Sequence, residues 1–124
     1  GCDNTNPNTT SVSGTVSLNP AVENGTLEIT LIDDNPAKSV VESQGPTTIT
    51  SLTSYKSFSF ILNETDLENY PPPYYASAVY TNEADVSTTA YYNYSGDSPP
   101  AGNGNISVTQ GEQTRGITIK IDLD

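Results

Sequence analysis

Apolar and polar residues alternate with a period of two along four stretches of the chain. The alternation is clearest at residues 11–18, 27–31, 57–62 and 117–123. A period of two is typical of strands that bury one face and expose the other to water. Strands of this kind pack as two sheets, so the pattern predicts a two-layer, all-β domain.

Weaker strand patterns lie between these stretches, separated by groups of Gly, Pro and Asn. They are expected at residues 39–43, 47–51, 74–80, 86–94 and 106–109. The breakers include Asn19-Pro20 and Gly45-Pro46. The one helical hint is at residues 65–69, where Thr65 is a candidate cap for a single turn. The chain is therefore predicted to form an antiparallel two-sheet β-sandwich of seven or eight strands, with no substantial helix.

The order of several short motifs adds a family resemblance. Val12-Ser13-Gly14-Thr15-Val16 is followed by a Phe-rich strand at residues 56–62, then by Tyr74-Tyr75-Ala76-Ser77-Ala78, and later by Gly96-Asp97. This order resembles the transthyretin-like, or carboxypeptidase-regulatory-like, β-sandwich family. A generic immunoglobulin-like sandwich is the alternative. The resemblance implies a non-enzymatic module of a secreted or surface protein, which acts as a spacer, an adhesive unit or a domain that binds a ligand or partner.

The chain divides into a polar first segment and a strand-forming remainder. Residues 1–10 are rich in Asn and Thr and are interrupted by Pro, which is typical of a flexible tether. Residues 11–124 are enough to bury the core of one β-sandwich domain without disulfides or a metal.

Cys2 is the only cysteine in a chain that contains no methionine, and a lone cysteine forms no internal disulfide. Gly1-Cys2-Asp3 resembles the junction left when a bacterial lipoprotein signal is cleaved, and that resemblance implies a lipid on Cys2. More than one acyl chain gives stable membrane attachment. The alternative is an unpaired thiol in a disordered end. The lipoprotein interpretation predicts a protein of the cell envelope, outside the cytoplasm and held at a membrane by lipid.

The charge balance narrows the classes of partner. Fifteen acidic residues stand against four basic ones, for a net charge of -11. Such a chain repels phosphate backbones, so nucleic-acid binding is not expected. High charge and Ser/Thr-rich strand edges favour a monomer. The expected partners are a membrane, through the lipid anchor, and a surface protein or glycan.

The sequence contains few candidates for catalytic residues. The chain contains no histidine, which removes Ser-His-Asp and Cys-His catalysis and the usual zinc sites. Adjacent acids such as Asp33-Asp34 are interpreted as loop residues that face water, whereas a glycosidase needs two carboxylates across a cleft. We expect no enzymatic activity and no required cofactor.

Two sets of residues are candidates for ligand binding. Some members of the resembled family carry a calcium loop after the Tyr-Tyr strand, which here implicates Glu83, Asp85 and Asp97, although the loop lacks an early aspartate and a glycine. A solvated acidic loop is the alternative. If Tyr74 faces the core, then Tyr75 and Tyr91 face outward, and exposed tyrosines suit sugars or protein partners. Ordinary core filling is the alternative for the tyrosines.

Together these observations predict a non-catalytic cell-envelope lipoprotein whose β-sandwich has a structural or partner-binding role. The alternative is an extracellular module that binds carbohydrate or calcium.

Overall fold

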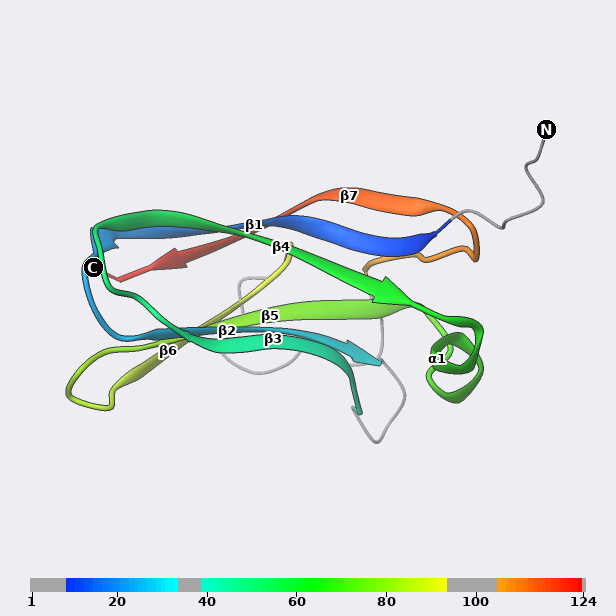
Figure 1. Ribbon diagram of the computed structural model, residues 1–124, viewed down its shortest axis with the longest axis horizontal. Helices are drawn as coiled ribbons and strands as arrows, with labels where there is room; N and C mark the ends of the chain where they lie inside the picture. Colours follow the sequence, from blue (N-terminus) through cyan, green and yellow to red (C-terminus); the bar gives the residue numbers. More distant parts are fainter. Residues whose placement is uncertain (1–8, 34–38, 94–104, 124) are drawn as a thin grey trace.

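The computed structural model describes residues 9–33, 39–93 and 105–123. In this part of the chain seven strands form two sheets that pack face to face, with one short helix at one end (Figure 1). The elements are β1 (Thr10–Val22), β2 (Thr26–Asp33), β3 (Val40–Thr48), β4 (Thr53–Leu62), α1 (Glu64–Asn69), β5 (Tyr74–Thr81), β6 (Ser87–Tyr91) and β7 (Gln113–Asp122). The predicted all-β sandwich is confirmed.

The strands are ordered β4-β1-β7 in one sheet and β3-β2-β5-β6 in the other. All neighbours are antiparallel except β1 and β7, which run parallel from Ser11 beside Gln113 to Asn19 beside Asp122. A parallel pair needs a long crossover connection. Here the connection is the rest of the domain, because the pair joins the first strand to the last.

The hydrophobic core lies between the two sheets and follows the alternation in the sequence. In β2 every second residue from Leu27 is buried, and the same holds for β7 from Ile117. The most deeply buried aliphatic residues are Val12, Val16, Ile29, Leu31, Ile106, Ile119 and Ile121. Each buried side chain of this size contributes about 1.5–3 kcal/mol through removal of apolar surface from water.

Two expected chain breaks lie inside strands instead. Gly45-Pro46 falls within β3, where Gly45 has φ of 99° and the pairing with β2 shifts between Leu27 and Ile29. Asn19-Pro20 falls within β1, at a register shift between Ser17 and Val22. Both prolines lie where the ladder is already irregular, and a bulge accommodates a residue that cannot donate a hydrogen bond.

Two smaller expectations also change. The strand expected at residues 106–109 is reduced to one bridge, in which Ile106 and Tyr74 exchange two backbone hydrogen bonds of 2.9 Å. Helix α1 begins at Glu64 and is capped by Asn63, not by Thr65. The Asn63 side chain accepts from the amide of Asp66 at 2.8 Å, and the Asp66 carboxylate accepts from the Asn63 amide at 3.1 Å, which completes a capping box.

The two ends of the sandwich differ. Thr10 pairs with Leu62, so β1 begins beside the start of α1. The opposite end carries the β1–β2 turn, the β3–β4 connection and the β5–β6 turn (Figure 1). The chain therefore enters the sandwich at the end that carries α1, and three connections lie at the far end.

Candidate functional site

The three connections at the far end form one surface, which we call the tip. It consists of residues 23–25, 49–52 and 82–86. Thr26 pairs with Thr48 on one side and with Thr81 on the other, so the three connections begin at neighbouring positions of one sheet. Loops held together on a rigid sandwich are a common place for binding.

Hydrogen bonds fix the tip connections to one another. The Tyr80 hydroxyl donates to the backbone carbonyl of Asn24 at 2.7 Å, and the amide of Ile49 donates to the carbonyl of Gly25 at 2.9 Å. Gly25 has φ of 92°, a conformation that favours glycine, and a Cβ at this position would lie 2.4 Å from the carbonyl oxygen of Thr81. The loops of the tip are therefore held in defined positions by contacts with one another.

The β5–β6 turn is organised by the side chain of Asn82. Its Oδ1 accepts from the amides of Ala84 and Val86 at 2.9 and 3.0 Å. The backbone amide of Asn82 donates to the carbonyl of Val86 at 3.0 Å, and that of Asp85 donates back to Asn82 at 3.0 Å. Asp85 has φ of 61° in this turn, a left-handed conformation that Asp tolerates better than most residues.

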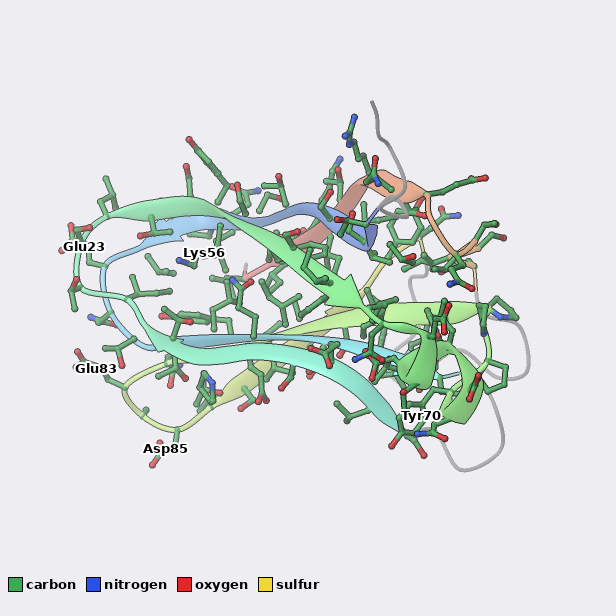
Figure 2. The ribbon with its side chains drawn as sticks, turned by 45° about the vertical axis from the view of Figure 1, so that its right-hand side comes forward. Glu23, Lys56, Tyr70, Glu83 and Asp85 are labelled. Carbon is green, nitrogen blue, oxygen red and sulfur yellow. The ribbon has the colours of Figure 1, made fainter. Side chains whose placement is uncertain are left out.

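Two of the three expected calcium ligands lie on this turn. Glu83 and Asp85 are both exposed, and Figure 2 shows them at the tip, with Glu23 at the same end. Asp97 lies outside the described residues. Among the residues that are described, no three acidic or other metal-binding side chains come close enough to hold an ion. Calcium prefers six to eight oxygen ligands, so this turn alone does not supply a site.

The tip also carries exposed apolar side chains. Leu52 and Val86 are two of the five large hydrophobic residues that are exposed in the described structure, and they lie on two different connections of the tip. The tip also carries the exposed carboxylates of Glu23, Glu83 and Asp85. The tip thus combines apolar contact area with negative charge.

Tyr75 and Tyr91 lie on the outer face of their sheet, but their expected exposure is wrong. Tyr91 pairs with Ser77, two residues after Tyr75, whereas Tyr74 belongs to the core between the sheets. The two side chains are only 1 % and 9 % exposed. Their rings meet edge to face, with centroids 6.1 Å apart and an interplanar angle of 63°. Neither ring therefore offers a free face to a sugar or a partner.

The end of the sandwich that carries α1 contains a buried carboxyl group. Asp33 is buried at the end of β2 and pairs with Tyr74 of β5. Burial raises the pKa of Tyr74 to about 12, and the negative charges of Asp33 and Asp66 add to the shift. The phenol therefore remains protonated, and its hydroxyl donates to the backbone carbonyl of Tyr70 just after α1. This bond fixes the end of the helix to the sheet.

The sequence contained a signal for this burial. Asp33 continues the alternation of Leu27, Ile29 and Leu31 in β2, so its side chain falls on the core side of the sheet. The interpretation of Asp33-Asp34 as a pair that faces water is therefore wrong for Asp33, and Asp34 lies outside the described residues.

Glu42 of β3 lies near the same end. Partial burial raises the pKa of its carboxyl group, and repulsion from Asp66 raises it further. The charged form of Glu42 is thus disfavoured in the folded state.

The described residues line two open cavities. One, of about 340 Å³, lies beside the start of α1 and contains Thr9, Ile61 and Glu64, with Gln110 donating to Glu64 at 2.7 Å. The other, of about 300 Å³, is lined by Pro72, Pro73, Ser107 and Val108. Glu64 is the single ionisable side chain among these lining residues. Neither cavity brings together the two carboxylates that a glycosidase would need.

No helix in the described part of the chain has the length and hydrophobicity needed to cross a membrane. Comparison with family models, with curated proteins and with solved structures finds no match to this chain. The transthyretin-like resemblance and the lipoprotein interpretation therefore stay predictions.

Proposed function

We propose that this protein is a non-catalytic, lipid-anchored module of the cell envelope with a structural or partner-binding role. The segment that precedes β1 would attach to a membrane through Cys2, and Thr10, expected to belong to this tether, is instead the first residue of β1. The sandwich would present the tip to material beyond that membrane.

The observation that carries this proposal is that the chain enters the sandwich at one end and the tip lies at the other. The chain enters β1 at Thr10, beside the start of α1, whereas the three tip connections lie at the other end (Figure 2). β1 contains 13 residues, and a strand rises about 3.3 Å per residue, so it separates the two ends by roughly 40 Å. An anchor at Cys2 would therefore hold the tip away from the lipid.

The chemistry of the surface supports binding over catalysis. The acids of the tip are exposed, with Glu23 on one turn and Glu83 and Asp85 on another, and the described residues show no paired catalytic carboxylates in either cavity. The apolar Leu52 and Val86 would give a partner contact area, while the carboxylates would favour partners with positive charge. For the alternative role in binding carbohydrate or calcium, the buried Tyr75 and Tyr91 and the exposed Glu83 and Asp85 supply no specific support.

A photo-reactive amino acid at Leu52, introduced in intact cells, tests this proposal. We expect it to cross-link to a discrete envelope component, because Leu52 is exposed on the tip. The same residue placed at Thr118, which is exposed on β7 away from the tip, is the matched control. If both positions label the same set of components, or if neither labels any, the tip is not the presenting surface.

A further inference from the structure

Among the described strands the sandwich has four edges, at β4, β7, β3 and β6, and three of them carry features that oppose the addition of another strand. β3 contains the Gly45-Pro46 irregularity, and β6 has only five residues. β7 carries Arg115, Lys120 and Asp122 and shifts register opposite Val12 and Gly14. Charges, prolines, bulges and short length are the usual protection of a sheet edge.

β4 lacks most of this protection. It has ten residues, contains neither Gly nor Pro, and has Lys56 as its one charged residue. Its pairing with β1 is unbroken from Leu62 to Tyr55. A long, regular edge strand is a template for pairing with another strand.

The backbone groups on the free side of β4 can be assigned from two hydrogen bonds. The Ser11 amide donates to Glu112, toward β7, so the ladder from β1 to β4 uses the alternate residues of β1, such as Val12. In agreement, the carbonyl of Ser57 accepts from the Gln44 side chain of β3 at 3.2 Å, on the side away from β1. Because successive residues point to opposite sides of a strand, Ser57, Ser59 and Ile61 direct their amides and carbonyls to the free edge.

The side chains of these same residues lie on the outer face of the sheet. This face is rich in hydroxyl groups, since Ser13, Thr15 and Ser17 of β1 lie beside Ser59, Ser57 and Tyr55 of β4. Two large apolar side chains stand out on it: Tyr55 is 65 % exposed and Ile61 is 60 % exposed. Both belong to β4, so the exposed apolar area of this face follows its free edge.

Charge is unevenly placed over the molecule. The whole chain has a net charge of -11, but the strands of the β4-β1-β7 sheet carry three basic residues and only one acid, Asp122. The strands that would meet therefore carry little negative charge, and the nearest acids in sequence, Glu64 and Asp66 of α1, lie just beyond the end of β4. High net charge favours a monomer, but the one charged residue of β4 itself is Lys56.

We propose that β4 pairs with β4 of a second copy of this chain, antiparallel and about a two-fold axis at Ser59. In this arrangement Ser59 faces its own equivalent, and Ser57 faces Ile61 of the second copy. Each of these three residues would donate and accept one backbone hydrogen bond across the axis. The two three-stranded sheets would become one sheet of six strands.

The second copy is the occupant because β4 is complementary to itself about this axis. Tyr55 of one copy would lie diagonal to Ile61 of the other, which is within reach of an aromatic ring. The exposed apolar side chains would cover one another, and the small Ser59 would lie at the centre. The two Lys56 side chains would be offset by six residues, about 20 Å along the strands, which exceeds the screening length of about 8 Å.

The pairing also has defined limits. Beyond Ile61 the ladder ends at Asn63, because its amide already donates to the Asp66 carboxylate. At Ser57 the backbone carbonyl already accepts from the Gln44 side chain. On pairing, the Gln44 side chain would share this carbonyl with the second copy or be displaced from it. The contact is therefore short, and we expect an association that depends on protein concentration.

Sedimentation equilibrium of the Cys2→Ser chain over a wide dilution series tests this proposal, which does not depend on the lipid anchor. The average mass is expected to rise from 13.2 kDa toward twice that value as concentration increases. Ser59→Lys is expected to hold the mass at that of the monomer, because it places two like charges at the axis. Thr118→Lys, on the exposed face of the β7 edge, is the matched control and should associate as the parent does.

A disulfide test keeps the proposal falsifiable if Ser59→Lys folds poorly. Two Ser59→Cys residues at the axis would have Cα atoms about 5.5 Å apart, within the range of a disulfide. With Cys2→Ser in both variants to remove the native thiol, oxidation should link Ser59→Cys into a covalent dimer and leave Thr118→Cys largely monomeric. A parent chain that stays monomeric at every concentration overturns the proposal. So does association that survives Ser59→Lys, or equal cross-linking of the two cysteine variants.

Discussion

Gly14 determines how closely β1 and β7 approach each other. It lies at the register shift between the two strands, in the middle of the Val12–Val16 motif. A Cβ on Gly14 would lie 1.7 Å from the carbonyl oxygen of Ile117, so any side chain would force the backbones apart. The close packing of β1 against β7 therefore requires a glycine at position 14, a requirement that the sequence pattern alone did not show.

Gly14→Ala is expected to lower the free energy of unfolding by about 1–3 kcal/mol, as is typical when a well-packed site is overfilled. The atom that obstructs the new methyl group belongs to the backbone, which cannot rotate away. Chemical denaturation would measure the change. Ser13→Ala, at the neighbouring outward position, is the control and should change stability much less. Equal stability of Gly14→Ala and the parent would show that β7 does not approach Gly14 as described.

The raised pKa of Glu42 predicts how the stability of the protein depends on pH. Its pKa in the folded state is raised above the usual 4.5, mainly by burial and then by Asp66. The folded state therefore holds this proton more tightly than the unfolded state, so the contribution of Glu42 to stability falls as pH rises above about 4.5. Glu42→Gln should flatten that fall and leave the protein at least as stable at neutral pH.

Denaturation of Glu42→Gln and the parent at a series of pH values between about 4 and 7 would measure this slope. Glu83→Gln removes an exposed carboxylate of the tip and is the matched control. A slope for Glu42→Gln that equals the parent's, or a fall in its stability at neutral pH, would contradict the assignment.

At the scale of elements, α1 depends on its cap and on one tertiary contact. A helix of six residues is too short to be stable alone. The capping box of Asn63 and Asp66 satisfies its first amides, and the hydrogen bond from Tyr74 to Tyr70 fixes its end. The helix is thus held from both sides by side chains.

Asn63→Ala is expected to destabilise α1 locally by about 1 kcal/mol, the usual effect of removing a cap. Hydrogen exchange should become faster at the amides of Leu67 and Tyr70, which bond to carbonyls of the first turn, at 3.2 and 2.8 Å. Amides in the core of β2 should not change. Asn69→Ala, at the other end of the same helix, is the control. Unchanged exchange at Leu67 would show that the cap does not support α1.

The elements themselves were largely predictable from the sequence, because alternation reports which face of a strand is buried. β2 follows this rule throughout, and β4 and β7 follow it from Phe58 and from Ile117 onward. Two of the failures have a common cause, because a proline does not always end a strand. At Gly45-Pro46 and Asn19-Pro20 the neighbouring strand shifts its register instead, and that shift depends on residues far away in the sequence.

At the scale of the whole molecule, the candidate site was less predictable than the fold. Alternation correctly directed Tyr75 and Tyr91 to the outer face, but whether a face is covered depends on tertiary packing. The gathering of residues 23–25, 49–52 and 82–86 into one tip likewise follows from the sheet order, which no local pattern contains. A prediction of site residues from each loop separately therefore missed the surface that the three loops form together.

The same scale connects the fold to the proposed function. The sandwich has a polarity, with the entry of the chain at the end that carries α1 and the tip at the other end (Figure 1). The proposed function uses that polarity, because an anchor at Cys2 would hold the chain at its beginning. The lipid on Cys2 is thus the part of the proposal on which the rest depends.

Mass spectrometry of the first peptide, taken from protein isolated from its native membranes, would show whether Cys2 carries a lipid. We expect a peptide that begins at Cys2 and carries the mass of a diacylglyceryl group, with a further acyl chain where the cell adds one. Release of the protein into the soluble fraction by Cys2→Ser would agree with that result. A peptide with an unmodified Cys2 thiol, from protein that is nonetheless at its native site, would rule out the lipid anchor.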